Sequence, residues 1–327
     1  MNMEYDFSLI IPVFNTELYI EKCLKSIDNQ TYSNYEVIII NDGSNDSSID
    51  ICNQYMKKIS NMIILNQENR GLSFSRNRAL NICKGKYIWF VDSDDFLHDS
   101  AALENIYRAL ENDELDILQF NAKFKVSTIN EWSQTKNKSL LLNNLQKTEV
   151  LTGREYLDLV ALYNEWRYGV WMFVFRKEFL LEKDLKFEEN FIHEDAAFNI
   201  KCLIVCDRIK YMDRCYYTYR IRPNSIMGTT TTIANIEGYL QAYRSIEKTF
   251  SRYNYFSGYY LQIIYLQIVE RFFYLRHSDL IKPYFGELES LGQSYMEEFN
   301  SVNLIMEAKL TNEKKYNNFL KVYDLEL

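Results

Sequence analysis

The densest group of acidic side chains in the sequence is Asp92-Ser93-Asp94-Asp95, which directly follows the apolar run Tyr87–Val91. Three carboxylates within four residues repel one another unless a cation lies among them. Hard oxygen ligands of this kind suit Mg²⁺ or Mn²⁺, which keep some waters and take further ligands from phosphate oxygens. A polar turn with an aspartate capping the next helix explains the same residues, so the motif alone leaves both interpretations open.

Three further polar clusters also follow apolar runs. They are Phe14-Asn15-Thr16-Glu17, Asp42-Gly43-Ser44 and Glu68-Asn69-Arg70-Gly71. Since an open α/β sheet binds its ligands at the carboxyl ends of the strands, we expect all four clusters to meet at one edge of a sheet. There Asp42 can accept a hydrogen bond from a pyrimidine N–H or a ribose hydroxyl, although Asp-Gly-Ser is also a frequent turn. Arg70 and Arg76 can face phosphates or a base, or can be solvated helix charges.

Several function classes are disfavoured by what the sequence lacks. It has no GxxxxGKS/T motif, and no GxGxxG follows the first strand, which argues against P-loop and Rossmann dinucleotide binding. Its formal net charge of −8 argues against a nucleic-acid partner. Of its six cysteines, only Cys202 and Cys206 have a metal-like spacing, and we interpret all six as buried small apolar residues.

The elements that must position these clusters read as an α/β sheet. Four continuous β-branched or aromatic runs, with starts 25 to 29 residues apart, predict strands buried on both faces, as in a parallel sheet. These runs are Ser8–Phe14, Val37–Asn41, Met62–Asn66 and Tyr87–Val91. Apolar stripes between them, such as Ile20, Leu24 and Ile27, predict amphipathic helices. The pattern predicts three βα units of a doubly wound sheet.

The pattern is less regular after Asp95. We expect a helix around Leu103–Leu110, a strand at Asp116–Val126 and a loop at 127–148. A capping box of Thr152 and Glu155 predicts a helix that runs to Leu162. Another helix is expected after Asp195, and one or two strands are expected within Arg208–Tyr219. The segment Gly228–Thr232 resembles a boundary, and residues 233–327 carry about four helix patterns rich in Tyr, Phe, Leu and Ile.

The N-terminus runs straight into a strand pattern without the features of a signal peptide. No apolar run reaches the 18 residues of a membrane span. We therefore expect a cytoplasmic protein that is at most attached to a membrane surface.

The strings around the polar clusters resemble the N-terminal half of a family-2 glycosyltransferase of GT-A fold, of the bacterial capsule and exopolysaccharide type. They are SLIIPVFN, NDGSNDSS, NRGLSFSRNRAL and GKYIWFVDSDD. The resemblance is strong over about residues 6–125 and extends more weakly to about residue 226. It implies a GT-A catalytic domain over 1–227, with a nucleotide-binding half (1–95) and an acceptor and sugar half (96–227), followed by a helical C-terminal region (228–327).

The resemblance implies a nucleotide-sugar site. Asp92-Ser93-Asp94 matches the DxD motif of the family, in which Asp94 would be the direct Mn²⁺ or Mg²⁺ ligand and Asp92 would lie nearer the ribose or a metal-bound water. The other nucleotide-sugar contacts would be Phe14, Asn15 and Glu17 around the base, Asp42 at the uracil or ribose, and Asn69 and Arg76 lining the pocket.

Further positions match the family beyond the DxD motif. In His193-Glu194-Asp195, Asp195 would be the general base, although the residues alone favour an N-cap of the following helix. His193 and Glu194 would lie near the acceptor or sugar. Trp171 would stack on a sugar face, or be a core aromatic.

Arg222 and Ser225 would belong to a loop that closes over the diphosphate, or be surface residues. The chain also departs from the family pattern at Asn41, Ala79 and Phe173, where the family usually has Asp, Gly and Lys. None of these departures removes the expected metal ligand or base.

The implied reaction is an inverting transfer of a hexose or N-acetylhexosamine from a UDP-sugar to a hydroxyl of a glycan acceptor. By analogy with the family, the acceptor would be a lipid-linked oligosaccharide at the inner face of the plasma membrane, used in capsule or exopolysaccharide synthesis. The C-terminal helices would pack on the catalytic domain, form a homodimer or contact the membrane peripherally.

The residues fit two other classes of protein less well. A nucleotidyltransferase-like enzyme should have a Gly-rich basic loop near the N-terminus, which Pro12-Val13-Phe14-Asn15 is not. A non-catalytic GT-A partner or carbohydrate-binding subunit should have lost the acidic motifs, and both are intact.

Overall fold

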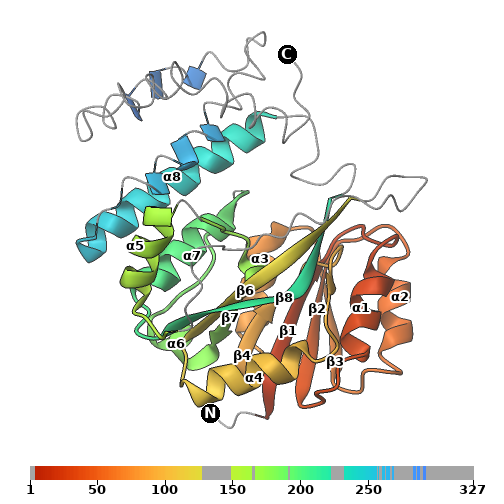
Figure 1. Cartoon of the computed structure of the whole chain (residues 1–327). Helices are drawn as coiled ribbons and strands as arrows, with labels where there is room; N and C mark the ends of the chain where they lie inside the picture. Colours follow the sequence, from red (N-terminus) through yellow and green to blue (C-terminus); the bar gives the residue numbers. More distant parts are fainter. Residues whose placement is uncertain are drawn as a thin grey trace.

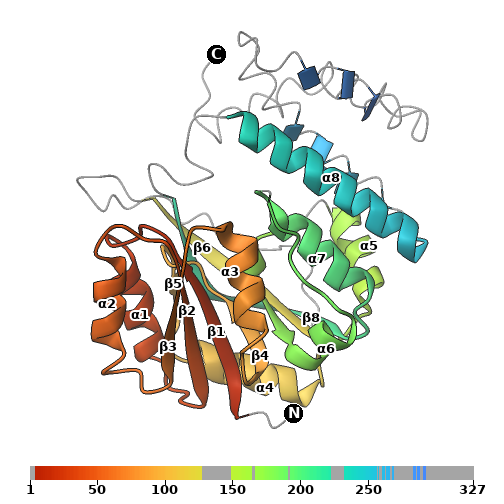
Figure 2. The same cartoon turned by 180° about the vertical axis from the view of Figure 1, so that it is seen from behind.

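A computed structural model shows an eight-stranded mixed sheet with helices on both faces (Figures 1 and 2). The structure describes residues 4–126, 149–163, 166–190, 192–221 and 232–255, together with scattered residues between 257 and 291. The strand order is β3-β2-β1-β4-β7-β6-β8-β5. This is the mixed α/β architecture that the sequence predicts, with a parallel first half and an irregular second half.

The first half of the sheet follows directly from the four apolar runs. Its parallel strands are β1 (Tyr5–Val13), β2 (Tyr35–Asp42), β3 (Met62–Gln67) and β4 (Gly85–Phe90). Strands β1, β2 and β4 are almost wholly buried because they are covered on both faces. Helices α1 (Ile20–Asp28) and α2 (Ser48–Tyr55) lie on one face, and α3 (Gly71–Leu80) lies on the other (Figures 1 and 2). The prediction for this half is confirmed.

The second half of the sheet adds the antiparallel pairings. Strand β7 (Phe173–Arg176) pairs antiparallel with β4 and with β6 (Ile117–Val126), β8 (Ile209–Ile221) runs parallel to β6, and β5 (Phe96–Leu97) pairs antiparallel with β8. The strand predicted at Asp116–Val126 is confirmed within one residue. The two-strand alternative for Arg208–Tyr219 is wrong, because β8 is continuous there. Strands β5 and β7 were not predicted, since two and four residues are too short to show a period.

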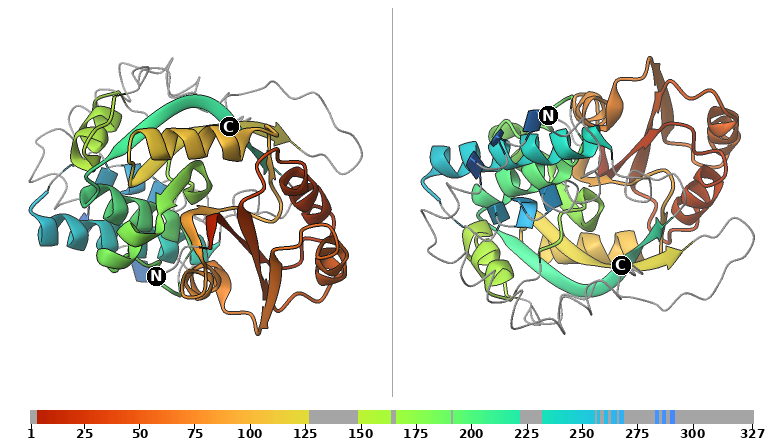
Figure 3. Two further views of the ribbon diagram at one scale, coloured as in Figure 1. Left: turned by 90° about the horizontal axis from the view of Figure 1, so that it is seen from below. Right: turned by 90° about the horizontal axis from the view of Figure 1, so that it is seen from above.

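The remaining described helices surround this second half. They are α4 (Ala102–Asn112), α5 (Gly153–Tyr163), the 3₁₀ turn η1 (Val170–Met172), α6 (Lys177–Glu182), α7 (Glu194–Ile204) and α8 (Ile233–Tyr253). The capping box before α5 is confirmed, since Thr152 N–H donates to the Glu155 carboxylate and Glu155 N–H donates to Thr152 Oγ1. Helix α8 lies across α7 on the side of the molecule away from α1 and α2 (Figure 3).

Some sequence predictions fall outside the described residues. These are the loop at 127–148, most of the Gly228–Thr232 boundary, and most of the helices expected beyond residue 255. The division of the chain at residue 227 therefore stays a prediction. Five of the six cysteines are buried as predicted, and Cys215 is half-buried. Among the described residues, no helix has the length and apolarity needed to cross a membrane.

Candidate active site

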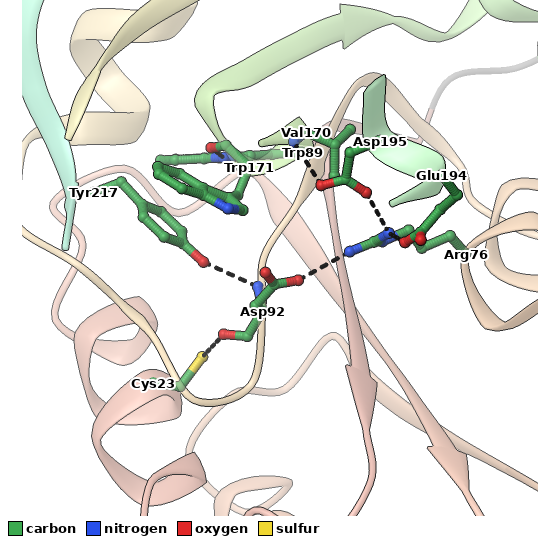
Figure 4. Close-up of polar contacts among 9 residues, drawn as sticks. All are labelled: Cys23, Arg76, Trp89, Asp92, Val170, Trp171, Glu194, Asp195 and Tyr217. Atoms are coloured by element: carbon green, nitrogen blue, oxygen red, sulfur yellow. Dashed lines mark hydrogen bonds and ion pairs between the residues drawn. The ribbon is translucent and has the colours of Figure 1, made fainter. Parts of the chain in front are cut away.

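The centre of the candidate site is a buried guanidinium that contacts three carboxylates. Arg76 of α3 is 1% exposed. Its Nη2 lies 3.1 Å from Asp92 Oδ1, and its Nη1 lies 2.5 Å from Glu194 Oε1 and 3.0 Å from Asp195 Oδ1 (Figure 4). The four side chains come from α3, from the turn after β4 and from the first turn of α7. One arginine therefore joins the DxD turn to the predicted catalytic base.

Charge in this cluster is unbalanced, because one cation faces three acidic groups. Burial alone would lower the pKa of Arg76, but Asp195, Glu194 and Asp92 raise it, so the guanidinium stays charged. Burial raises the pKa of Asp92 to about 6, against the opposing effect of Arg76. Burial, together with the Asp195 charge, raises the pKa of Glu194 to about 8. The Glu194 carboxyl is thus largely protonated near neutral pH.

Asp195 is held through both of its carboxylate oxygens. Oδ1 accepts a hydrogen bond from Arg76 Nη1, and Oδ2 accepts one from the Val170 backbone N–H at 3.1 Å. The residue lies in the first turn of α7, where a negative charge is favoured by the helix dipole. The N-cap alternative for Asp195 is therefore wrong, because His193 occupies the N-cap of α7 and Asp195 lies within the first turn. The general-base role of Asp195 stays a prediction.

The DxD turn is fixed by hydrogen bonds to residues of β8. The Asp92 backbone N–H donates to Tyr217 Oη at 3.0 Å, and the Arg220 backbone N–H donates to Asp95 Oδ1 at 2.7 Å. Asp95 is fully buried and Ser93 is 5% exposed, whereas Asp94 is half-buried. Asp92 is half-buried as well and contacts Arg76. The assignment of Asp94 as the metal ligand stays a prediction.

A metal ion at this turn would need ligands from outside the protein. Among the described residues, no three His, Cys, Asp or Glu side chains are grouped so that they could hold a metal ion together. The donor set around Asp94 is nevertheless hard and acidic, as Mn²⁺ and Mg²⁺ require. The turn thus fits a cation whose coordination is completed by phosphate oxygens and water.

Asp42 has a clear structural partner set. Its Oδ1 accepts from the Arg70 N–H and from Gln67 Nε2, and its Oδ2 accepts from the Gly71 N–H. The side chain is 4% exposed and caps the amino end of α3, the helix that carries Arg76. The predicted contact with uracil or ribose stays a prediction, and the capping role is a finding.

The residues predicted to surround the base lie at the β1–α1 loop. Asn15 has a left-handed backbone (φ 51°), and its Oδ1 accepts from the Asn45 N–H, while Glu17 Oε2 accepts from the Ser47 N–H. These bonds join the loop to the segment after β2. Phe14 is 45% exposed, which leaves its ring available to a ligand.

Asn69 is also exposed and lies across from Gly43. Gly43 has φ +80°, and a Cβ there would come within 3.0 Å of the Asn69 backbone N. The two loops therefore approach each other too closely for a side chain at position 43.

The structure places Trp171 in the core and does not describe the predicted closing loop. Trp171 is buried and stacks on Tyr217, with ring centroids 4.7 Å apart, and its carbonyl accepts from Trp89 Nε1. This is the core-aromatic alternative, and its stacking on a sugar stays a prediction. Arg222 and Ser225 lie outside the described residues.

Two lysines that the sequence did not single out lie beside the DxD turn. Lys22 of α1 is 4.1 Å from the centre of the Phe96 ring, and the buried Arg220 guanidinium is 5.6 Å from the same ring. Burial and the charges of Lys125 and Arg220 lower the pKa of Lys22 to about 8. Lys125 pairs with Arg220 in the β6–β8 register, and no spacing within the sequence reveals that these three cations meet.

Glycosyltransferases of GT-A fold combine a doubly wound first half with an acidic turn after its fourth strand. They also carry an ordered carboxylate on the second half. Residues 8–182 match the model of Glycosyl transferase family 2, and the chain belongs to this family.

Relatives in sequence support the assignment. The chain is similar to the uncharacterized glycosyltransferase YibD of Escherichia coli, with 32% identity over 69% of this chain and 64% of that protein. It is also similar to the uncharacterized glycosyltransferase EpsJ of Bacillus subtilis, with 32% identity over 67% of this chain and 62% of that protein. The chain thus spans less than two thirds of the length of these relatives.

Solved structures share the fold at lower identity. S. aureus TarS in complex with UDP-GlcNAc is superposable with a TM-score of 0.65 at 22% identity, over 89% of this chain and 80% of that one. The mannosyltransferase PcManGT from Pyrobaculum calidifontis, in complex with GDP-Man and Mn²⁺, gives a TM-score of 0.56 at 14% identity, over 89% of this chain and 80% of that one.

Proposed function

We propose that this protein is an inverting glycosyltransferase that moves a hexose or N-acetylhexosamine from a UDP-sugar to a hydroxyl of a glycan acceptor. The observation that carries the proposal is the Arg76 cluster, in which the DxD turn and Asp195 contact the same guanidinium. A donor bound over the turn would then lie beside the carboxylate that activates the acceptor. TarS, which shares the fold, is described in complex with UDP and with UDP-GlcNAc, which supports a uridine nucleotide.

In this mechanism Asp195 accepts the proton of the acceptor hydroxyl while that oxygen forms a bond to the anomeric carbon. The bond from the anomeric carbon to the nucleotide diphosphate breaks with inversion, and its electron pair leaves with the diphosphate. Arg76 and the Val170 N–H hold Asp195 in place for this transfer. Lys22, Lys125 and Arg220 place positive charge beside the turn where a diphosphate would lie.

A divalent cation fits the same turn. Asp94 would hold Mn²⁺ or Mg²⁺, and the ion would neutralise charge that develops on the leaving diphosphate. The Mn²⁺ in PcManGT shows that a GT-A fold of this general kind accommodates one. We propose a lipid-linked oligosaccharide as the acceptor from the resemblance to capsule and exopolysaccharide enzymes. The related sequences include bacterial glycosyltransferases and a minor teichoic acid biosynthesis protein of Bacillus subtilis.

Calorimetric titration of UDP, with and without Mn²⁺, tests the donor site. We expect binding that depends on the metal and is lost in Asp94→Ala, while Asp50→Ala, an exposed aspartate in the first turn of α2, binds UDP like the wild type. A panel of UDP-sugars would then identify the donor by turnover. Absence of UDP binding under both conditions would overturn the UDP donor, and UDP binding without turnover of any donor would favour a non-catalytic subunit.

A further inference from the structure

The residue just before α7 has an unusual backbone conformation. His193 precedes α7 with φ 69° and ψ 27°, the left-handed region. For a residue with a Cβ this conformation is strained, and it persists only where the surroundings impose it. The dihedral angles of His193 set the direction in which α7 starts, and so the position of Glu194 and Asp195.

Helix α8 supplies the contact that holds this residue. The imidazole of His193 stacks on the ring of Tyr239, with centroids 3.8 Å apart and planes inclined by 11°. Tyr239 is fully buried. Because the Tyr239 ring is itself buried, the stack restricts the side chain of His193. The backbone at position 193 is restricted in turn.

The neighbouring residue on α8 allows this close approach. A Cβ on Gly238 would come within 2.6 Å of both the carbonyl oxygen and Cγ1 of Ile192. Any larger residue at position 238 would therefore push α8 away from the segment that leads into α7. Gly238 and Tyr239 together place α8 directly against Ile192 and His193.

A second point of attachment lies at the other end of the same segment. Ser245 Oγ of α8 donates to Glu188 Oε1 at 2.6 Å, and Lys201 of α7 forms an ion pair with the same carboxylate. The segment from Glu188 to His193 is thus held by α8 at both of its ends. Helix α8 itself starts at a capping box formed by Thr232 and Asn235.

We propose that α8 is a positioning element for the catalytic base, and that Tyr239 and Gly238 hold His193 in the conformation that presents Asp195 to Arg76 and to the Val170 N–H. This inference rests on the proposed role of Asp195. It assigns to the first helix of the C-terminal region a function in the reaction that is distinct from donor binding, because the contacts that carry it are with Glu188, Ile192 and His193.

The test separates a lost stack from lost stability. Tyr239→Leu keeps an apolar side chain but removes the ring. We expect kcat to fall by about 10- to 100-fold, because displacing a catalytic carboxylate by about 1 Å lowers the rate by up to about this factor. The Kd for UDP and the KM for the donor should stay within about two-fold of the wild type. Tyr239→Phe keeps the ring and should restore kcat. Phe250→Leu, a buried ring on the same helix that contacts Tyr255 and Tyr260, should lower Tm without this loss of kcat.

The outcomes are separable from those of the proposed function. If Asp195→Asn is inactive while Tyr239→Leu keeps wild-type kcat, the role of α8 is wrong and the base is not. Equal losses of kcat in Tyr239→Leu and Phe250→Leu would also overturn the proposal, because the effect would then be one of general stability. Should Tyr239→Leu fail to fold, Gly238→Ala tests the same contact, and a folded variant with unchanged kcat would contradict the proposal. Full activity of Asp195→Asn would instead remove the proposed base itself.

Discussion

The guanidinium of Arg76 and the carboxylate of Asp195 lie 3.0 Å apart, although 119 positions separate them in the chain. The first residue belongs to α3 and the second to α7. Because Arg76 also contacts Asp92 of the DxD turn, this pair would fix the proposed base relative to the proposed donor site. One buried ion-pair cluster thus links the DxD turn to Asp195.

Replacing Arg76 should therefore damage both stability and activity. In Arg76→Met the buried carboxylates lose their cation, and we expect the free energy of unfolding to fall by about 3 kcal/mol or more and kcat to fall by at least about 100-fold. Denaturant titration and donor turnover measure the two effects. Arg78→Met is the control, since Arg78 makes its contacts to Asn66 and Gln67 rather than to the site. A stable and active Arg76→Met would contradict the role given to the cluster.

The carboxylates around Arg76 predict how stability depends on pH. Burial raises the pKa of Glu194 from its ordinary value of 4.5 to about 8, so the folded protein holds a proton that the unfolded chain releases. The stabilisation is fully present below pH 4.5 and is lost as pH rises through 8. Between pH 5 and pH 8 we expect the free energy of unfolding of the ligand-free protein to decrease by an amount on the order of 3 kcal/mol from this group.

Glu194→Gln should flatten this slope, because the amide does not titrate. Glu189→Gln, an exposed neighbour that contacts Asn77, should leave the slope unchanged. Denaturant titrations across the pH range make the comparison. A slope that is identical in the wild type and in Glu194→Gln would mean that Glu194 is ionised in the folded protein throughout.

The fold of the first half could be predicted from the sequence because its signals are local. A continuous apolar run such as Ser8–Phe14 is followed by a helical stripe such as Ile20, Leu24 and Ile27, and the structure places both as expected. Strand β7 escaped prediction because its four residues, Phe173–Arg176, are defined by pairing with β4 and β6. Pairing between distant segments leaves no period in the sequence.

The residues of the candidate site were predicted from the sequence, but the contacts among their side chains were not. Asp92, Asp94, Arg76 and Asp195 were each proposed as site residues from motifs, and the structure brings Arg76, Asp92 and Asp195 into contact. That Arg76 contacts acidic groups rather than facing solvent could not be predicted, because its partners follow it by 16 to 119 positions. The meeting of His193 with Tyr239 was hidden for the same reason.

Asp195→Asn should separate binding from catalysis. The amide can still accept from the Val170 N–H, but it cannot take a proton from the acceptor, so we expect kcat to fall by about 10²- to 10⁴-fold. Since Asp195 lies on α7 and not in the DxD turn, the Kd for UDP should stay within about three-fold of the wild type. Calorimetry and turnover with the identified donor provide both numbers. A variant with wild-type turnover would show that another group acts as the base.

Asp42→Ala should weaken the donor site through the helix that carries Arg76. The substitution leaves the Arg70 and Gly71 N–H groups without their acceptor, while Gln67 Nε2 keeps its second acceptor, Ser75 Oγ. Loss of such a cap costs about 1 to 2 kcal/mol of stability. If Asp42 also contacts the nucleoside, the Kd for UDP should rise by at least about 10-fold, while the affinity for inorganic pyrophosphate with Mn²⁺ should change little. Glu155→Ala, which removes the acceptor of the Thr152 N–H at the start of α5, is the matched control. Equal losses for UDP and pyrophosphate would mean that Asp42 acts only by capping α3, and that the base is recognised by other residues.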